Sequence, residues 1–156
     1  MPLPRRWDIF ARCGDPAHAD ADKRGDVRGD AYGSPDGLWF DPRGLLWIQT
    51  DVSTSAMNKG DYANLGNNTM LAADVATGET RRFLVGPTGC EVTGVVMTPD
   101  LTTMFVDIQH PGESPSERAD PDRPKAISSW PDGPSGGRPR SATIVVRRRD
   151  GGIVGS

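Results

Sequence analysis

The sequence contains no long apolar segment. A helix that crosses a bilayer needs about 20 consecutive apolar residues, and no stretch of this chain approaches that length. Arg5 and Arg6 are similar to the start of a twin-arginine export signal, but residues 7–30 are polar, acidic and glycine-rich where such a signal has its apolar region. We therefore expect a chain with no membrane partner and no export signal of its own, which would leave it in the cytoplasm.

The sequence also has few clusters of basic residues. The net charge is −3, and the arginines are scattered. Residues 147–149 form the one dense basic run, and because Asp150-Gly151 follows, we expect that run to be a solvated hairpin tip. A nucleic-acid partner is not expected, since phosphate backbones are bound by clustered lysine and arginine.

Cysteine and the common catalytic motifs are scarce. Cys13 and Cys90 are the two cysteines, and their spacing permits a disulfide without requiring one and does not make a zinc site. The sequence has no Gly-x-Ser-x-Gly elbow, no His-Glu-x-x-His pair, no Walker loop and no Cys-x-x-Cys pair. These absences remove the support for a serine hydrolase or a zinc enzyme.

What the chain has in abundance is turn-forming residues. Gly 19 and Pro 14 stand beside a hydrophobic share of 35%, which favours turns and short strands over long helices. Residues 1–33 show no sustained period and are expected to be an irregular lead-in.

From residue 34 the pattern becomes that of paired strands. A hairpin is expected from strands 37–41 and 45–50 with a turn at 42–44, and a second hairpin from strands 69–74 and 79–85. The first hairpin recurs about 57 positions later as strands 92–97 and 103–108, which aligns Gly37 with Gly94 and Pro42 with Pro99. After a loop insertion at 109–140, strand 141–147 and the turn at Asp150-Gly151 begin another hairpin that stops at Ser156.

A repeated four-strand unit of this size is typical of propeller blades. We therefore predict an all-β fold of antiparallel four-stranded meanders, about two blades of a partial β-propeller. The first blade spans residues 34–90 and an incomplete last blade spans 91–156. A closed propeller has at least four blades, so the others would lie upstream in a longer parent chain, or the bare faces would be covered by self-association.

Several segments together resemble one enzyme family. Residues 34–51, 66–74, 89–94 and 108–113, followed by 140–146 and 151–155, are similar in order to the C-terminal part of the PhoX family of bacterial alkaline phosphatases. The resemblance implies a propeller-based, calcium- and iron-dependent phosphomonoesterase that is exported in folded form, to the periplasm or beyond. It covers about the last quarter of such an enzyme, so we expect the isolated chain to be inactive.

Two carboxylates precede the expected inner strands of the two blades. Asp36 stands before the first inner strand and Glu91 before the second. Inner strands of a propeller converge on a central channel, where two carboxylates would repel each other unless a cation lay between them. We predict Glu91 and Asp36 as ligands of a shared cation. The alternatives are an Asp that serves the turn after Pro35 and a Glu91 that is an exposed loop carboxylate.

Two further candidates end the strands that follow. Asp51 is a candidate calcium ligand, and His110, its near counterpart, is a candidate contact for phosphate or a metal, with a plain surface imidazole as the alternative. Asn67 and Asn68 offer oxygen ligands but more often cap turns. The strand aromatics are expected to pack between blades rather than to hold substrate; they are Trp39, Phe40, Trp47 and Phe105.

Two other functions are kept open by these patterns. The chain is either the enzyme-derived module described above or a non-catalytic partial propeller that folds by self-association through exposed faces and edge strands. A weaker alternative is a calcium-dependent lactonase-like propeller, because Pro35-Asp36-Gly37 resembles the metal-binding Pro-Asp-Gly of gluconolactonase-type propellers. The segments around Glu91 and His110 do not favour it.

Overall fold

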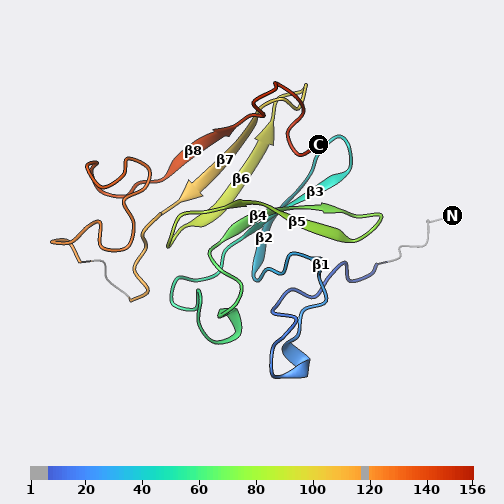
Figure 1. The fold of residues 1–156 in the computed structure, drawn as a ribbon, viewed down its shortest axis with the longest axis horizontal. Helices are drawn as coiled ribbons and strands as arrows, with labels where there is room; N and C mark the ends of the chain where they lie inside the picture. Colours follow the sequence, from blue (N-terminus) through green and yellow to red (C-terminus); the bar gives the residue numbers. More distant parts are fainter. Residues whose placement is uncertain (1–6, 117–119) are drawn as a thin grey trace.

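The computed structural model describes residues 7–116 and 120–156 and contains two β-sheets (Figure 1). The start of the expected lead-in, residues 1–6 with Arg5 and Arg6, lies outside the described residues, as do residues 117–119 of the expected insertion. Most of the regular structure is strand, and the helical segments are single 3-10 turns at Ala21–Lys23 and Gly60–Tyr62. The predicted all-β class is confirmed at this level.

The first sheet is a four-stranded antiparallel meander with one added edge strand. Its order is β1-β5-β4-β3-β2. The strands are β1 (Arg28–Gly29), β2 (Pro35–Phe40), β3 (Leu45–Thr50), β4 (Thr69–Asp74) and β5 (Glu79–Val85). The four long strands agree with the predicted ones. Strand β1 pairs in parallel with β5 and was not expected, since two residues are too few to produce a period.

The second sheet has three antiparallel strands in the order β6-β7-β8. They are β6 (Glu91–Met97), β7 (Met104–Gln109) and β8 (Ala142–Val146). The insertion leaves the sheet between β7 and β8 and forms the orange loops in Figure 1. No strand follows β8 in the described chain, so the second unit lacks a fourth strand.

The last residues turn back toward the first sheet instead of forming the outer hairpin that the sequence suggested. Val154 is buried, its N–H donates to the carbonyl of Leu101 at 3.0 Å, and its carbonyl accepts from Nη2 of Arg43 at 3.0 Å. The buried side chain of Val154 holds the tail against the core. Both backbone polar groups of Val154 are hydrogen-bonded, so its burial leaves no polar backbone atom unpaired. Arg147, Arg148 and Arg149 are exposed before it, so the basic run is solvated as expected, but no strand follows it in the described residues and it is not a hairpin tip.

The two inner hairpins repeat each other down to an irregularity in one strand. The register between β2 and β3 shifts between Pro35 and Leu38, around Gly37, and the register between β6 and β7 shifts between Thr93 and Val95, at Gly94. A Cβ at Gly37 would lie 2.5 Å from Oε1 of Gln49, and one at Gly94 would lie 2.5 Å from Oδ2 of Asp107. Glycine lets the polar side chain of the partner strand lie against the backbone at both bulges, and at Gly94 the φ of +49 also favours glycine.

The main core lies between the sheets. Trp47 and Met70 of the first sheet pack with Val92, Met104 and Val106 of the second, and all are fully or almost fully buried. The ring of Phe83 meets Trp47 edge to face, with centroids 5.0 Å apart. Trp39 packs against the same core. Trp39 and Trp47 therefore pack between the sheets, as expected for the strand aromatics.

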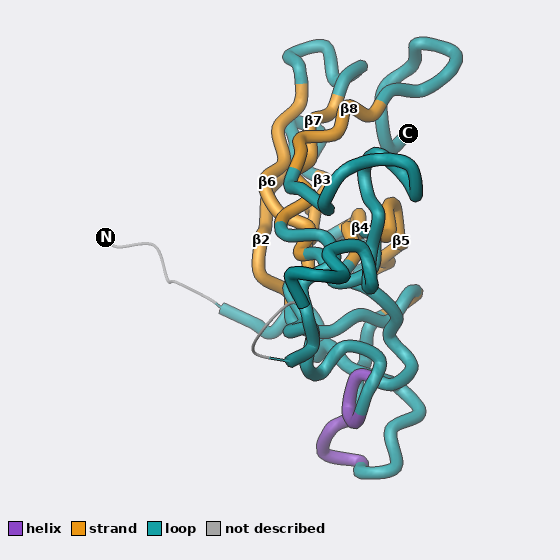
Figure 2. The backbone as a smooth tube through the Cα atoms, turned by 90° about the vertical axis from the view of Figure 1, so that its left-hand side faces the viewer, coloured by secondary structure: helices purple, strands orange, loops and turns teal. Residues whose placement is uncertain are grey.

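The other face of the first sheet is covered by the lead-in. Leu46, Ile48 and Leu71 are buried there with Tyr32, and Cys13 and Val27 pack against them. Cys13 and Cys90 are both free and belong to different cores, so the disulfide that the sequence permitted does not form. Figure 2 shows the strands of the sheets together, with the helical turns in the loops at the opposite end.

Parts of both outer faces remain exposed. Leu38 and Phe40 pair with Ile48 and Leu46 across β2 and β3, yet they are 64% and 58% exposed because the lead-in does not reach them. Phe40 therefore does not pack between the two sheets. On the second sheet, Val96, Phe105 and Val145 are cross-strand partners in one row, and both valines are more than half exposed. No helix in the described ranges is long and apolar enough to cross a membrane.

Candidate functional site

Strand pairing brings the candidate residues to the open ends of the two inner hairpins. Pro35 pairs with Thr50, and the N–H of Asp51 donates to the carbonyl of Ser34 at 3.0 Å. In the second hairpin Glu91 pairs with Gln109, and His110 follows directly. Each hairpin therefore presents the start of one strand and the end of the next at the same edge.

Glu91 is the first residue of β6 and is only 9% exposed. Its Oε2 accepts a hydrogen bond from Nε2 of Gln109 at 3.0 Å and lies 3.6 Å from Nε2 of His110. The interpretation of Glu91 as an exposed loop carboxylate is therefore wrong. A carboxylate with so little contact with water and one neutral donor is poorly compensated and favours a positively charged neighbour.

His110 lies between two glutamates. Its Nε2 faces Glu91, and its Nδ1 lies 3.8 Å from Oε2 of Glu113. The residue has φ 37, and its backbone N–H donates to Oγ of Ser141 at 2.9 Å. A non-glycine residue with positive φ costs energy that its surroundings must offset. The ring is 36% exposed, so His110 is more constrained than a plain surface imidazole.

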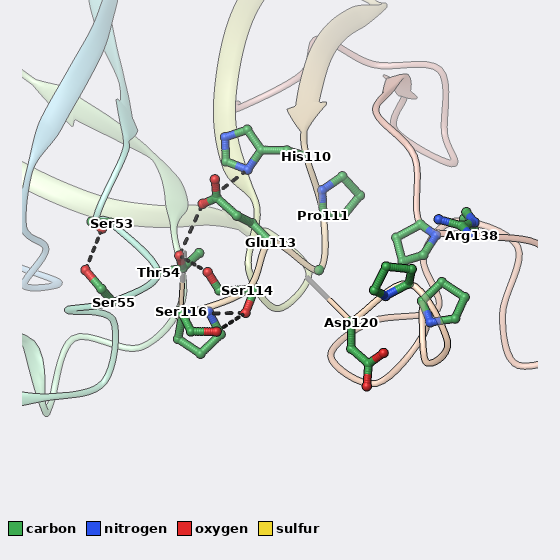
Figure 3. Close-up of a pocket in the computed structure, with 15 residues that line it drawn as sticks. Ser53, Thr54, Ser55, His110, Pro111, Glu113, Ser114, Ser116, Asp120 and Arg138 are labelled. Carbon is green, nitrogen blue, oxygen red and sulfur yellow. Dashed lines mark hydrogen bonds and ion pairs between the residues drawn. The ribbon is translucent and has the colours of Figure 1, made fainter. Parts of the chain in front are cut away.

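Glu113 joins the two hairpins and was missed by sequence reasoning. Its Oε2 accepts from Oγ1 of Thr54 at 3.1 Å, so the carboxylate bridges the loop after β3 and the imidazole after β7. Figure 3 shows His110, Glu113 and Thr54 directed toward one another. The spacing of Glu113, three residues after His110 in one loop, was the available signal, but spacing in a loop does not determine where a side chain points.

The backbone beneath these side chains is fixed by two glycines. The N–H of Gly112 donates to the carbonyl of Thr88 at 2.9 Å, and the N–H of Glu113 donates to the carbonyl of Gly89 at 3.0 Å. Gly89 has φ +67, and a Cβ there would lie 2.9 Å from the carbonyl oxygen of Glu113. The segment before Glu91 and the segment after His110 are therefore in direct backbone contact, which only glycine permits.

Asn68 also has a structural role here. The side chain is 1% exposed; its Oδ1 accepts from the N–H of Val52 at 2.7 Å, and its Nδ2 donates to the carbonyls of Val52 and Cys90 at 3.0 Å and 2.9 Å. It ties the loop after β3 to the residue before Glu91. All of its side-chain atoms are engaged, so Asn68 is not a free oxygen ligand.

Asp36 and Asp51 do not join this cluster. Both are exposed, and among the described residues neither carboxylate makes a hydrogen bond or an ion pair. The strand register also places Ser34, rather than Asp36, at the position equivalent to Glu91, because Ser34 stands opposite Asp51 as Glu91 stands opposite Gln109. The shared site of Asp36 and Glu91 stays a prediction.

Burial also determines the chemistry of the neighbouring thiol. Cys90 is fully buried, and burial together with the adjacent Glu91 charge raises the pKa of its thiol to about 12. A thiol with this pKa is almost entirely protonated near neutral pH, so Cys90 is a core residue and not a nucleophile.

An open pocket of about 620 Å³ lies beside His110. Its walls come from the loop after β3, the loop after β7 and the insertion, and they include Thr54, His110, Glu113 and Arg138. Hydroxyls from Ser53, Ser55 and Ser114 also line it. The cavity offers donors from an imidazole, a guanidinium and several hydroxyls, beside the carboxylates of Glu113 and Asp120, so it is suited to a polar ligand.

Comparison with known proteins gives consistent results. The family model described as "Alkaline phosphatase PhoX" matches residues 3–112. Among solved structures, Pseudomonas fluorescens PhoX in complex with vanadate, a transition state analogue, is similar with 47% sequence identity and a TM-score of 0.78. That match covers 94% of this chain and 24% of the other, so this chain spans about a quarter of its length. No curated protein sequence matches.

Proposed function

Because this chain belongs to the PhoX family of alkaline phosphatases, we propose that it supplies one wall of a phosphomonoesterase active site, centred on Glu91 and His110. The observation that carries the proposal is the nearly buried carboxylate of Glu91 with the imidazole of His110 beside it, at the mouth of a polar pocket. Vanadate, bound by the similar P. fluorescens protein, mimics a phosphoryl group in transfer. A phosphate monoester is the substrate class that fits.

Charge separates the roles of the two residues. A carboxylate repels a phosphate dianion, so Glu91 would act on phosphate only through a cation placed between them. His110 is able to contact a phosphate oxygen directly, because a protonated imidazole nitrogen donates a hydrogen bond to it. Gln109 holds one oxygen of Glu91 and thereby fixes the direction of the carboxylate.

Calcium and iron are the metals that we propose for the intact site. Carboxylate oxygens suit calcium, and carboxylate with imidazole suits iron, so Glu91 and His110 have the right chemistry. The described part of the chain nevertheless contains no group of three acidic, histidine or cysteine side chains placed to hold an ion. The residues present therefore do not complete a metal site, and the chain would contribute ligands rather than the whole site.

An assay tests the expectation that follows. The purified 156-residue chain, given p-nitrophenyl phosphate with calcium and iron at alkaline pH, is expected to show no turnover above buffer. The reason is that it spans about a quarter of the similar phosphatase and lacks a complete ligand group in its described part. Turnover that is lost in Glu91→Gln would show that the chain is sufficient and would contradict the proposed division of the site.

The exposed faces favour a second proposal about architecture. The two sheets pack face to face and repeat the same bulged hairpin, which is the relation between neighbouring propeller blades. The row of Val96, Phe105 and Val145 on the second sheet is the counterpart of a face that is buried on the first. We propose that further units of the same kind, or a second copy of the chain, cover it.

A further inference from the structure

We propose that the free edge of β8 binds a fourth β-strand from outside these 156 residues. That strand is acidic at its start and apolar at alternate positions. β8 is the outermost strand of the second sheet (Figure 1). Beyond its ladder with β7, its backbone groups make no hydrogen bond within the described residues. The edge is separate from the candidate site around Glu91, so the proposal does not depend on the proposed function.

The first sheet shows which element belongs at this edge. The bulged hairpins align Trp47 with Phe105, because each lies two residues before the side chain that covers the bulge glycine. Trp47 pairs with Ala72 of β4, and Phe105 pairs with Val145 of β8. β8 is therefore the counterpart of β4, whose other edge pairs with β5. In the described part of the chain, no counterpart of β5 stands beside β8.

The face of the first sheet that such a strand would cover is open as well. Leu45, Ala72 and Phe83 pack toward the core between the sheets, and they line a hollow of about 440 Å³. Gly155 of the tail borders the same hollow. Because β5 has no counterpart opposite it, this hollow is where the alternate side chains of an added strand would lie. Apolar side chains suit it, since they extend the core.

The end of β8 is positively charged. Nε of Arg147 bonds the neutral hydroxyl of Thr103 at 2.8 Å. Arg148 is paired with Asp150, whereas Arg149 makes no hydrogen bond or ion pair within the described residues. A strand that runs antiparallel to β8, as β5 runs to β4, begins beside this end. Acidic residues at its start would stabilise the pair, because opposite charges across two strands attract.

The same charges argue against a second copy as the occupant. If two β8 strands paired antiparallel about Ile144, the arginine run 147–149 of one copy would lie beside Arg140 of the other, at both ends of the pair. Like charges across two strands destabilise the pairing, and charged residues at an edge are a common protection against self-association. A strand of opposite charge is not excluded in this way, and addition of a strand to an open edge is a general mode of peptide binding.

A synthetic peptide with the sequence of residues 77–86, which contains β5, is the probe. It carries Arg81→Thr and Arg82→Val, which remove like charge and place an apolar residue toward the hollow. Thr80 of β5 pairs with Ala73, the counterpart of Val146, so Glu79 of the peptide would lie opposite Arg147. We expect this peptide to slow amide hydrogen exchange at Ala142–Val146 about tenfold near saturation, because it makes their outer N–H groups hydrogen-bonded.

A charge exchange tests the orientation. The same peptide with Glu79→Lys should bind the unaltered chain about fivefold more weakly, the upper effect of one exposed ion pair. In the chain variant Arg147→Glu the order of the two peptides should reverse. Arg28→Glu, in β1 at the far edge of the first sheet, is the matched control and should leave the order unchanged.

A peptide with Arg82→Pro in place of Arg82→Val should not slow exchange, because proline cannot donate to a strand ladder. Equal slowing by that peptide would overturn the proposal, as would no slowing at β8 by the first peptide at millimolar concentration. Slow exchange at β8 that deepens with the concentration of the chain alone would make a second copy the occupant and would also overturn it. If Arg147→Glu does not fold, the two peptides on the unaltered chain decide.

Discussion

At the scale of single residues, Asp41, in the turn between β2 and β3, is a carboxylate with several hydrogen-bond partners. Its side chain is fully buried and accepts from Nε of Arg43 at 3.0 Å, from Nε1 of Trp47 at 3.2 Å and from the N–H of Leu45 at 3.2 Å. Burial by itself would raise the pKa of Asp41, but hydrogen bonds from Arg43, Trp47 and the backbone outweigh it and hold the pKa below its ordinary value.

We predict that Asp41→Asn destabilises the chain by about 2 kcal/mol, because the amide has one accepting oxygen where the carboxylate has two, so a donor from Arg43, Leu45 or Trp47 loses its acceptor. Asp74→Asn is the control: Asp74 is exposed and caps the β4–β5 turn, where Asn serves as well, so its change should stay within about 0.5 kcal/mol. Urea unfolding measures both. Equal effects would show that Asp41 is an ordinary turn residue.

The contribution of Asp41 should also be visible in how the free energy of unfolding depends on pH. A folded-state pKa below the unfolded value of about 3.9 means that Asp41 stabilises the fold above that pH. The contribution is lost as the pH falls through the folded-state pKa. Asp41→Asn should therefore weaken the acid dependence of the free energy of unfolding, and an unchanged acid dependence would contradict the assignment.

Part of the cluster that the structure brings together could be predicted from the sequence at this scale. Glu91 and His110 were identified from their places before and after strands, because the ends of a hairpin must meet. Glu113 was not, since it is positioned by Thr54 from another hairpin. Contacts between loops depend on packing that no local period encodes.

At the scale of elements, the strands follow from the alternation of apolar residues and the turn signals between them. The long strands β2 to β7 lie within a few residues of the predicted ranges, and Gly37 and Gly94, aligned by sequence, occupy equivalent bulges. The docking of the tail through Val154 and the coverage of the first sheet by the lead-in were not predictable. Both rest on a few isolated apolar residues in irregular segments.

Gly89 allows a test of how the loops around Glu91 fit together. Gly44 and Gly89 both have positive φ, at +85 and +67, but a Cβ at Gly44 meets nothing within 4 Å. Gly44→Ala should cost about 1 kcal/mol, the conformational penalty alone. Gly89→Ala should cost about 2–3 kcal/mol, because the methyl group also presses on the Glu113 backbone. Equal costs in denaturant unfolding would mean that the contact between the two segments is loose.

At the scale of the whole molecule, the second sheet exposes a row of apolar residues, through which we expect the isolated chain to associate. Val96 and Val145 are 57% and 58% exposed on either side of Phe105. Apolar faces of this kind are normally covered.

We predict that light scattering finds concentration-dependent oligomers of the unaltered chain, and that the double variant Val96→Lys with Val145→Lys shifts it to monomer. Val75→Lys is the matched control, because Val75 is an exposed valine in the β4–β5 turn, away from the row. A chain that is monomeric at every concentration would remove the case for a face that needs a partner.

The central claim, that Glu91 binds a cation as part of a phosphatase site, is tested most directly by the thermal unfolding of the chain with and without calcium. A weak site with a Kd of about 1 mM gains about 1.4 kcal/mol at about 10 mM calcium, or about 3–5 °C for a chain of this size. We predict that rise for the unaltered chain and for Glu79→Gln, and less than half of it for Glu91→Gln, which keeps the shape and removes the charge. The same rise in Glu91→Gln, or none in the unaltered chain, would contradict the account.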